Sequence, residues 1–188
     1  MTGFCRRAAA QTIAGLKLED ANRALAEHWL SLWPGDGLPP RAALNPAKLK
    51  SHLPNIVLFN VVPETRVQVR LAGTHVEKIM GATLAGADWI ALAGPARAAI
   101  RLAMFSVLAR GAMLVDHRHA AMAVGGPAVL EEIILPFAPD ADGMSLVLAH
   151  VNLSAEQYLK IARVKNVLSE PLDHQVVPFA RVAEAVAA

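Results

Sequence analysis

The chain has 188 residues, which is enough for one domain with a hydrophobic core and a terminal extension. Its net charge of +2 is too small to favour a nucleic-acid partner, and its basic residues are dispersed. No apolar run approaches the roughly 20 residues of a membrane span, so we expect no membrane helix. The single Cys5 cannot form an internal disulfide, which favours a reducing cytoplasm.

An amphipathic helix is predicted from Leu18 to Trp33, where Pro34 follows. Residues 1–16 show no clear period and are expected to form a flexible arm. The apolar stripe of the helix contains Leu25, Trp29, Leu32 and Trp33. Such a stripe packs against its own domain or forms a dimer or partner interface, because aromatic residues favour both environments. We treat these four residues as a candidate interface.

The centre of the chain predicts a hairpin that turns directly into a helix. The apolar segment Ile56 to Val62 and the alternating segment Arg66 to Ala72 flank a Pro-Glu-Thr turn. Thr74 and Glu77 then have the spacing of a capping box, and Gly81 stands where a left-handed C-terminal cap is expected. The helix between them can hardly exceed two turns.

The flanking segments follow the same reasoning. Asn45 and Asp88 are expected to cap short helices. A long helix is predicted from Pro95 to Gly111, with Ile100, Met104, Val107 and Leu108 facing inward. Three strands follow, over residues 112–124, 128–137 and 144–152, with turns at glycine-rich segments. A last helix is predicted over residues 155–164, and the remainder is expected to be a loosely attached tail.

These elements and several short motifs resemble a known family. The motifs are the tryptophan helix, the Leu-Pro-Pro-Arg segment at 38–41 with Asn45-Pro46, Leu53-Pro54, the segment from Arg70 to Gly81, the Thr-Leu-Ala-Gly segment at 83–86, and Leu135-Pro136. In this order they are similar to the bacterial family of small stand-alone PAS proteins, the fifth PAS subgroup. The likeness covers about residues 25–153.

The resemblance implies an α+β fold, with a five-stranded antiparallel sheet flanked by short helices. It also implies a sensory or adaptor role in signalling, and it supplies no ligand or cofactor. Ala82, Ala85 and Phe137 depart from the residues expected in the family, which alters pocket polarity rather than the fold. We therefore expect a PAS-like domain over residues 17–154, followed by a C-terminal helix and tail over residues 155–188.

Apolar residues at strand and helix spacing indicate either a core or a ligand cavity between sheet and helices, because both need large apolar side chains. Arg70 lies in a strand among apolar neighbours, so it either reaches solvent along its aliphatic stem or binds an anionic group. The candidate ligand-binding residues are Leu58, Arg70, Leu71, Thr74, Ile79, Met80, Trp89, Met104, Leu108, His117, Ile134 and Leu148.

The densest polar cluster is Asp116-His117-Arg118-His119. His117 and His119 would point to the same face of a strand, which suits two metal ligands or an acid/base pair. No third or fourth ligand is evident, so we expect solvent-facing or pocket histidines rather than a metal site. A lone histidine as a haem ligand has no support in the local sequence, and Cys5 lies outside the domain, which disfavours a flavin adduct.

The sequence thus predicts a cytoplasmic, non-catalytic PAS-like domain that binds a small molecule or a signalling partner, and that forms a homodimer. Filling the pocket would shift how the tryptophan helix packs on the sheet. Two alternatives remain open at this point. One is a small α+β isomerase or hydrolase that uses Asp116 with His117 or His119. The other is a ligand-free dimerisation module with a fully packed interior.

Overall fold

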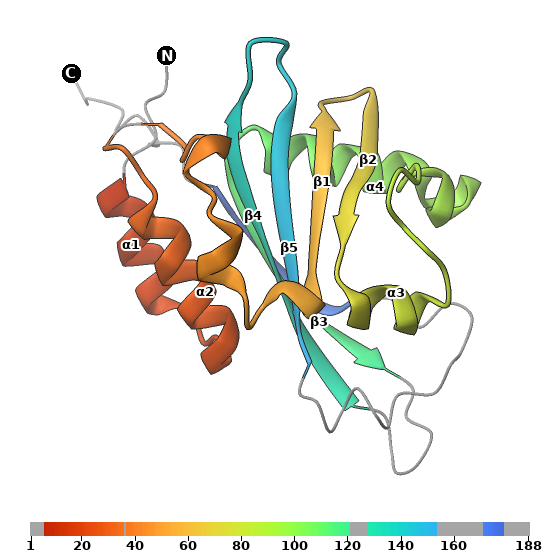
Figure 1. The fold of residues 1–188 in the computed structure, drawn as a ribbon, viewed down its shortest axis with the longest axis horizontal. Coiled ribbons are helices and arrows are strands. Elements are labelled where there is room, and N and C mark those ends of the chain that lie inside the picture. The colour runs from red at the N-terminus through yellow and green to blue at the C-terminus, as the bar shows by residue number, and fades with distance from the viewer. Residues whose placement is uncertain (1–5, 36, 121–127, 154–170, 179–188) are drawn as a thin grey trace, which may run out of the picture.

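The protein is built on one antiparallel sheet, shown in Figure 1. The structure is a computed structural model that describes residues 6–35, 37–120, 128–153 and 171–178. The strands are β1 (Ile56–Val62), β2 (Arg66–Ala72), β3 (Ala112–Ala120), β4 (Ala128–Pro139), β5 (Ser145–Asn152) and β6 (Pro171–Pro178), in the order β2-β1-β5-β4-β3-β6. All pairings are antiparallel. The expected α+β fold, with the five strands β1 to β5 in one antiparallel sheet, is confirmed.

Helices cover both faces of the sheet. α1 (Arg6–Gly15) and α2 (Asp20–Ser31) lie on one face, while α3 (Thr74–Met80) and α4 (Pro95–Ala109) lie on the other. Within the described residues there are also four short 3-10 helices, namely η1 (Arg41–Ala43), η2 (Pro46–Leu49), η3 (Leu53–Asn55) and η4 (Ala91–Ala93). As predicted, the side chain of Asn45 caps η2, and the Asp88 carboxylate accepts from the amides of Ile90 and Ala91.

The N-terminal segment differs from the prediction. Residues 1–16 were expected to form a flexible arm, but Arg6–Gly15 is a helix whose Ala9 and Ile13 are 0% and 2% exposed. A helix of 10 residues is marginal by itself, so its stabilisation comes from the packing of Ala9 and Ile13 into the core shared with α2. The expectation of a flexible arm is therefore wrong for this helix.

The tryptophan stripe is buried within the protomer. Leu25, Trp29 and Trp33 are 2%, 1% and 4% exposed, and Leu32 packs against the same cluster. The two indoles meet edge to face, with ring centroids 5.2 Å apart, and Trp29 Nε1–H donates to the carbonyl oxygen of Pro136 at 2.9 Å. The prediction of an intersubunit interface is therefore wrong for Leu25, Trp29 and Trp33, because these side chains are buried within the same chain. Leu32 is half-buried, and its role in an interface stays a prediction.

The two faces have separate cores. The α1/α2 face is filled by side chains of both helices and of alternate strand positions, among them Ile56, Met113, Ile133, Leu135, Phe137 and Leu148. The α3/α4 face contains Val57, Phe59, Val69, Phe105, Leu108, Leu114, Ile134 and Val147. In α4, Met104 and Leu108 pack inward as expected, but Ile100 and Val107 are 72% and 47% exposed. The buried stripe of α4 instead runs through Phe105, Leu108 and Ala109.

The turn from β2 into α3 depends on Gly73. A Cβ atom there would lie 2.2 Å from the carbonyl oxygen of Leu53 and 2.3 Å from that of Pro54, so only glycine permits this approach of η3. Gly81 has φ +67 and caps α3 as predicted. The predicted capping box is wrong: Gly73 is the N-cap residue, and Glu77 Oε1 accepts from the amide of Leu84 at 2.8 Å instead.

The C-terminal part of the chain also differs from the prediction. Residues 171–178 form β6, which pairs antiparallel with β3 at the edge of the sheet, whereas this segment was expected to be a loose tail. A strand edge offers unpaired backbone groups, and β6 satisfies them along β3. The helix predicted over residues 155–164 lies outside the described residues.

Candidate functional site

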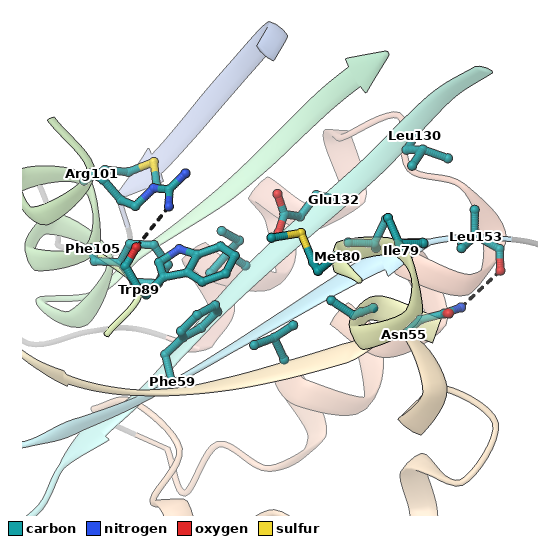
Figure 2. A pocket seen from close by; sticks show the side chains of 15 residues that line it. Asn55, Phe59, Ile79, Met80, Trp89, Arg101, Phe105, Leu130, Glu132 and Leu153 are labelled. Carbon is teal, nitrogen blue, oxygen red and sulfur yellow. Dashed lines mark hydrogen bonds between the residues drawn. The ribbon is translucent and has the colours of Figure 1, made fainter. Parts of the chain in front are cut away.

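A pocket lies between the sheet and the α3/α4 layer (Figure 2). Its walls come from η3, β1, α3, the segment around Trp89, α4, β4 and β5. The lining residues are Asn55, Val57, Phe59, Val76, Ile79, Met80, Trp89, Arg101, Met104, Phe105, Leu130, Glu132, Ile134, Val151 and Leu153. The cavity volume is about 80 Å³. One water needs roughly 10–15 Å³ on this scale, so the pocket has room for several waters or a small organic group.

Aromatic and sulfur-containing side chains dominate one end of the pocket. The Phe59 ring lies 5.2 Å from that of Trp89 and 4.8 Å from that of Phe105, measured between centroids. The Arg101 guanidinium carbon lies 4.8 Å from the Trp89 ring centroid, and its Nη1–H donates to the Trp89 carbonyl oxygen at 3.0 Å. This pair fixes the α4 side of the pocket to the segment that carries Trp89.

The other end of the pocket has a polar anchor. Asn55 Nδ2–H donates to the carbonyl oxygen of Leu153 at 3.1 Å, and its Oδ1 lies 2.9 Å from His75 Nδ1. Because Oδ1 can only accept, His75 donates from Nδ1. Asn55 thus joins η3 to the end of β5 and to α3, and it holds three walls of the pocket together.

Among the residues predicted to bind a ligand, Ile79, Met80, Trp89, Met104 and Ile134 line this pocket. Leu58 and Leu148 pack against the opposite core, because strand side chains alternate between faces. The wall positions next to Leu58 are Val57 and Phe59, while Val147, next to Leu148, belongs to the α3/α4 core. Leu108 is fully buried in the core beneath the pocket. These placements correct the prediction for Leu58, Leu108 and Leu148.

The remaining predicted residues also lie outside the pocket. Leu58 pairs with Leu71 and Phe59 with Val69, so Arg70 is the extra residue of a bulge. Arg70 and Leu71 are consequently exposed, the latter at 43%, and Thr74 is exposed at the start of α3. His117 lies on the opposite face of the sheet. The prediction is therefore wrong for the placement of all four side chains.

The structure also separates the proposed acid/base cluster. Leu114 belongs to the α3/α4 core and Val115 to the α1/α2 core, so Asp116 and His117 continue onto opposite faces. Asp116 pairs in register with the pocket residue Glu132, and His117 with Glu131. The side chain of His119 lies outside the described residues. Asp116 and His117 therefore do not share a pocket, and the described geometry gives the enzyme alternative no support.

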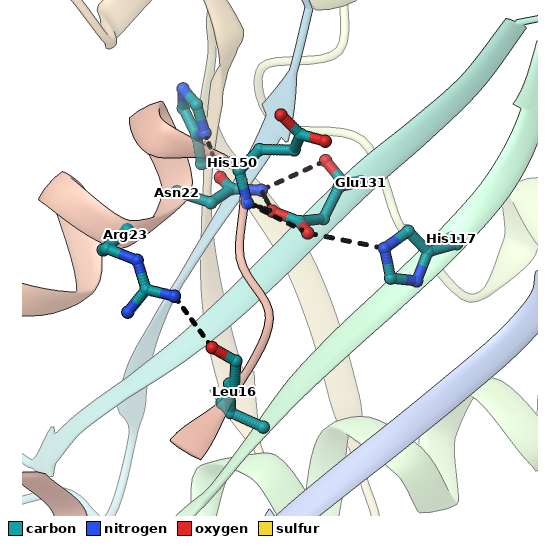
Figure 3. Close-up of polar contacts among 7 residues, drawn as sticks. Leu16, Asn22, Arg23, His117, Glu131 and His150 are labelled. Carbon is teal, nitrogen blue, oxygen red and sulfur yellow. Dashed lines mark hydrogen bonds and ion pairs between the residues drawn. The ribbon is translucent and has the colours of Figure 1, made fainter. Parts of the chain in front are cut away.

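A second polar cluster lies on the α1/α2 face (Figure 3). The buried Asn22 of α2 donates from Nδ2 to Glu131 Oε1 at 2.7 Å, while its Oδ1 lies 2.6 Å from His150 Nδ1. Glu131 also accepts from the backbone amide of Glu19 at 3.0 Å, at the N-terminus of α2, and Glu131 Oε2 lies 3.4 Å from His117 Nε2. We call Asn22, Glu131, His150 and His52 the latch cluster.

Hydrogen bonding fixes the tautomers in the latch cluster. Asn22 donates to Glu131, so its Oδ1 accepts and His150 Nδ1 carries a proton. The Nε2 atom of neutral His150 is then an acceptor, and it lies 3.3 Å from His52 Nδ1, which donates. Burial, followed by the neighbouring His52, lowers the pKa of His150 to about 3. Burial, followed by His28, also lowers the pKa of His52.

Sequence reasoning missed the latch cluster and much of the pocket wall. Asn22 shares the apolar stripe of Leu25, Ala26 and Trp29 and is 0% exposed, so a polar residue on that stripe was the available signal. Nothing in the sequence distinguished Phe59, Phe105 and Val57 from ordinary core residues. The missed pocket residues are Asn55, Val57, Phe59, Val76, Arg101, Phe105, Leu130, Glu132, Val151 and Leu153.

Comparison with known proteins gives one family assignment. Among the described residues, no helix is long and apolar enough to cross a membrane, and no three metal-ligating side chains come together to hold an ion. A comparison with curated proteins found no match. A family model described as "PAS domain" matches residues 18–151, which is more than half of the chain. With the antiparallel sheet, its helical cover and the pocket between them, this match shows that the chain belongs to the PAS domain family.

Proposed function

We propose that this PAS domain is a non-catalytic sensor that binds a small, mostly apolar molecule in the pocket. The observation that carries the proposal is the pocket itself, which sits between the sheet and the α3/α4 layer and whose walls are mostly apolar. Asn55, Arg101 and Glu132 are the polar or charged side chains among its lining residues, and Trp89 adds an indole N–H. A few polar groups on an apolar wall orient a ligand while its apolar body supplies the affinity.

The methionines permit a direct test with 1-hexanol as the probe. Met80 and Met104 line the pocket, whereas Met113 is 0% exposed in the opposite core. Labelling methionine methyl groups with carbon-13 therefore places reporters and an internal control in one spectrum. We expect the Met80 and Met104 signals to shift saturably with 1-hexanol and the Met113 signal to move much less.

Matched variants sharpen this test. Ile79→Phe adds bulk inside the pocket and should weaken 1-hexanol binding about tenfold, because the added ring occupies the ligand's space. Ile100→Phe makes the same change at a side chain that is 72% exposed, and it should bind the probe like the wild type. Equal shifts at all methionines, or equal binding by both variants, would contradict the proposal.

In this proposal, ligand binding changes the position of the N-terminal helices or the binding of a partner protein. The α1/α2 pair packs on the sheet face opposite the pocket, so a change in the sheet reaches it directly. A homodimer or a signalling protein would have to contact a surface other than Leu25, Trp29 and Trp33, which are buried in the protomer. Light scattering during size exclusion tests the dimer, which would double the mass of about 20.0 kDa.

The ligand-free dimerisation alternative has less support. A module of that kind needs a fully packed interior and a tryptophan face buried between subunits. The pocket leaves space in the interior, and the tryptophan face is covered by the chain's own sheet. Native mass spectrometry of the purified protein checks this directly, since a retained small molecule would appear as added mass on the protomer.

A further inference from the structure

We propose that the latch cluster couples occupancy of the pocket to the docking of α1 and α2 on the opposite face of the sheet. This inference rests on the proposed function, because it describes how ligand binding in that pocket would affect α1 and α2. Its basis is that β4, β5 and the segment 52–55 each contribute at least one residue to the pocket wall and, within three positions, one residue to the latch cluster.

The first element is β4. Glu132 lines the pocket, and its neighbour Glu131 points to the other face, where its carboxylate accepts from Asn22 and from the amide of Glu19, the N-cap residue of α2. Adjacent strand residues share one peptide unit, so a tilt or shift of β4 that accommodates a ligand at Glu132 moves the Glu131 carboxylate as well. The hydrogen bonds at 2.7 and 3.0 Å tolerate little displacement before they weaken.

The second and third elements repeat the arrangement. In β5, Val151 lines the pocket and His150 holds Asn22 Oδ1. Asn55 lies in η3 and lines the pocket, while His52, the residue before η3, contacts His150. Asn55 also ties the Leu153 carbonyl at the end of β5 to η3. A ligand that displaces the Asn55 end of the pocket therefore moves two latch residues together.

The helix side of the latch is a single buried side chain. Asn22 forms hydrogen bonds to the sheet through both Oδ1 and Nδ2, and it lies on the same stripe as Leu25, Ala26 and Trp29. The surrounding core is apolar, and apolar contacts alone allow a helix to slide. Directional hydrogen bonds to β4 and β5 define one docked position, because any other position leaves buried polar groups unpaired. The latch therefore gives α2 a specific docked state that the pocket can bias.

Hydrogen exchange of α2 (Asp20–Ser31) measures this docking. We expect saturating 1-hexanol to change amide exchange in α2 about fivefold in the wild type, which is a typical size for coupling between two sites. Ile79→Phe, which fills the pocket without ligand, should produce a change in the same direction. Ile100→Phe is the matched control on the exposed face of α4 and should leave α2 unchanged.

Two latch variants and one control locate the coupling. Glu131→Met keeps the length of the side chain but removes both oxygens that accept from Asn22 and from the Glu19 amide, and Asn22→Ser shortens the bridge to both strands. In each, Met80 and Met104 should still respond to 1-hexanol while the α2 response falls below about twofold. Arg23→Ala removes a hydrogen bond to the Leu16 carbonyl between α1 and α2, outside the latch, and should keep the wild-type response. Either latch variant suffices if the other does not fold.

The outcomes separate the two proposals. Methionine shifts without any change in α2 exchange would overturn the latch and leave ligand binding intact. A full α2 response in Glu131→Met would also overturn it. If 1-hexanol does not bind in the pocket, the proposed ligand preference fails for this probe. Hydrogen exchange of α2 in Ile79→Phe then tests the coupling: altered exchange supports it, and unchanged exchange overturns it.

Discussion

The two faces of the sheet are formed by the same strands, but they differ in how completely the helices and side chains fill the space above them. On the α1/α2 face, large side chains fill the space, and the polar groups of the latch cluster satisfy one another. On the α3/α4 face, short elements and an aromatic cluster leave a pocket. The pocket lies where α4 shares the cover of the sheet with the short helix α3 and the segment around Trp89. We therefore expect the α1/α2 face to contribute more to stability, while the proposed ligand site lies on the α3/α4 face.

Truncating the tryptophan at the centre of the packed face should have the largest effect. We expect Trp29→Ala to lower the free energy of unfolding by about 3–5 kcal/mol, because it opens a cavity and removes the donor to the Pro136 carbonyl. Chemical denaturation followed by far-UV circular dichroism measures this. Trp29→Phe should cost less, since the ring remains. A loss below about 1 kcal/mol for the alanine variant would show that this face is not the main source of stability.

Methionines on the two faces test the contrast with the same substitution. Met113→Ala should cost about 2–4 kcal/mol, because its side chain is fully buried in a filled core. Met104→Ala should cost about 1 kcal/mol or less, because one side of Met104 already faces free space and its removal enlarges a pocket rather than creating a cavity. Equal losses in thermal or chemical unfolding would mean that both faces are equally packed.

Gly73 tests the close approach that shapes the pocket wall. Gly73→Ala should lower the free energy of unfolding by about 1–3 kcal/mol, since the new methyl group meets the Leu53 and Pro54 carbonyls and displaces η3. Gly15→Ala is the matched control, because nothing lies within 4 Å of a Cβ there. A change in the chemical shift of the Met80 methyl group in Gly73→Ala, and not in Gly15→Ala, would confirm that the effect reaches the pocket. No difference between the two variants would contradict the role assigned to Gly73.

Lowering the pH should weaken the packed face through His150. The unfolded chain binds a proton near pH 6.5, whereas the folded protein holds the pKa of His150 at about 3, so the stabilisation is complete above pH 6.5 and is lost as the pH falls. The loss approaches about 1.4 kcal/mol per pH unit well below pH 6.5. Between pH 6.5 and 5.8 it is only about half a kcal/mol, because the unfolded His150 is partly neutral there. The lowered pKa of His52 acts in the same direction.

Unfolding experiments at pH 7.5, 6.5 and 5.8 measure this loss, and the nitrogen-15 shifts of His150 report its tautomer. His150→Gln should show a smaller slope between pH 6.5 and 5.8 than the wild type. The His150 imidazole should stay neutral, with its proton on Nδ1, throughout this range. An imidazole that titrates near pH 6.5 in the folded protein would contradict the assigned burial and the hydrogen bond to Asn22.

The order of elements in the domain could be predicted from the sequence because each has a local cause. Periodicity and capping residues predicted the strands β1 to β5, the helices α2 and α4 and the left-handed cap at Gly81. Which side of a strand faces the pocket could not be predicted. In the continuous apolar segment of β1, Leu58 and Phe59 are equally suited to either face, and the bulge at Arg70 reverses the alternation in β2.

The sequence by itself determined the PAS architecture, through the positions of its turns, caps and apolar runs. Only the tertiary structure decided three other features: the burial of the tryptophan stripe within the protomer, the helix at residues 6–15 and the meeting of Asn22 with Glu131 and His150. The physical reason is sequence distance. Local backbone preferences act over a few residues, whereas Asn22 and His150 are 128 residues apart in the sequence and meet only because α2 packs on the sheet.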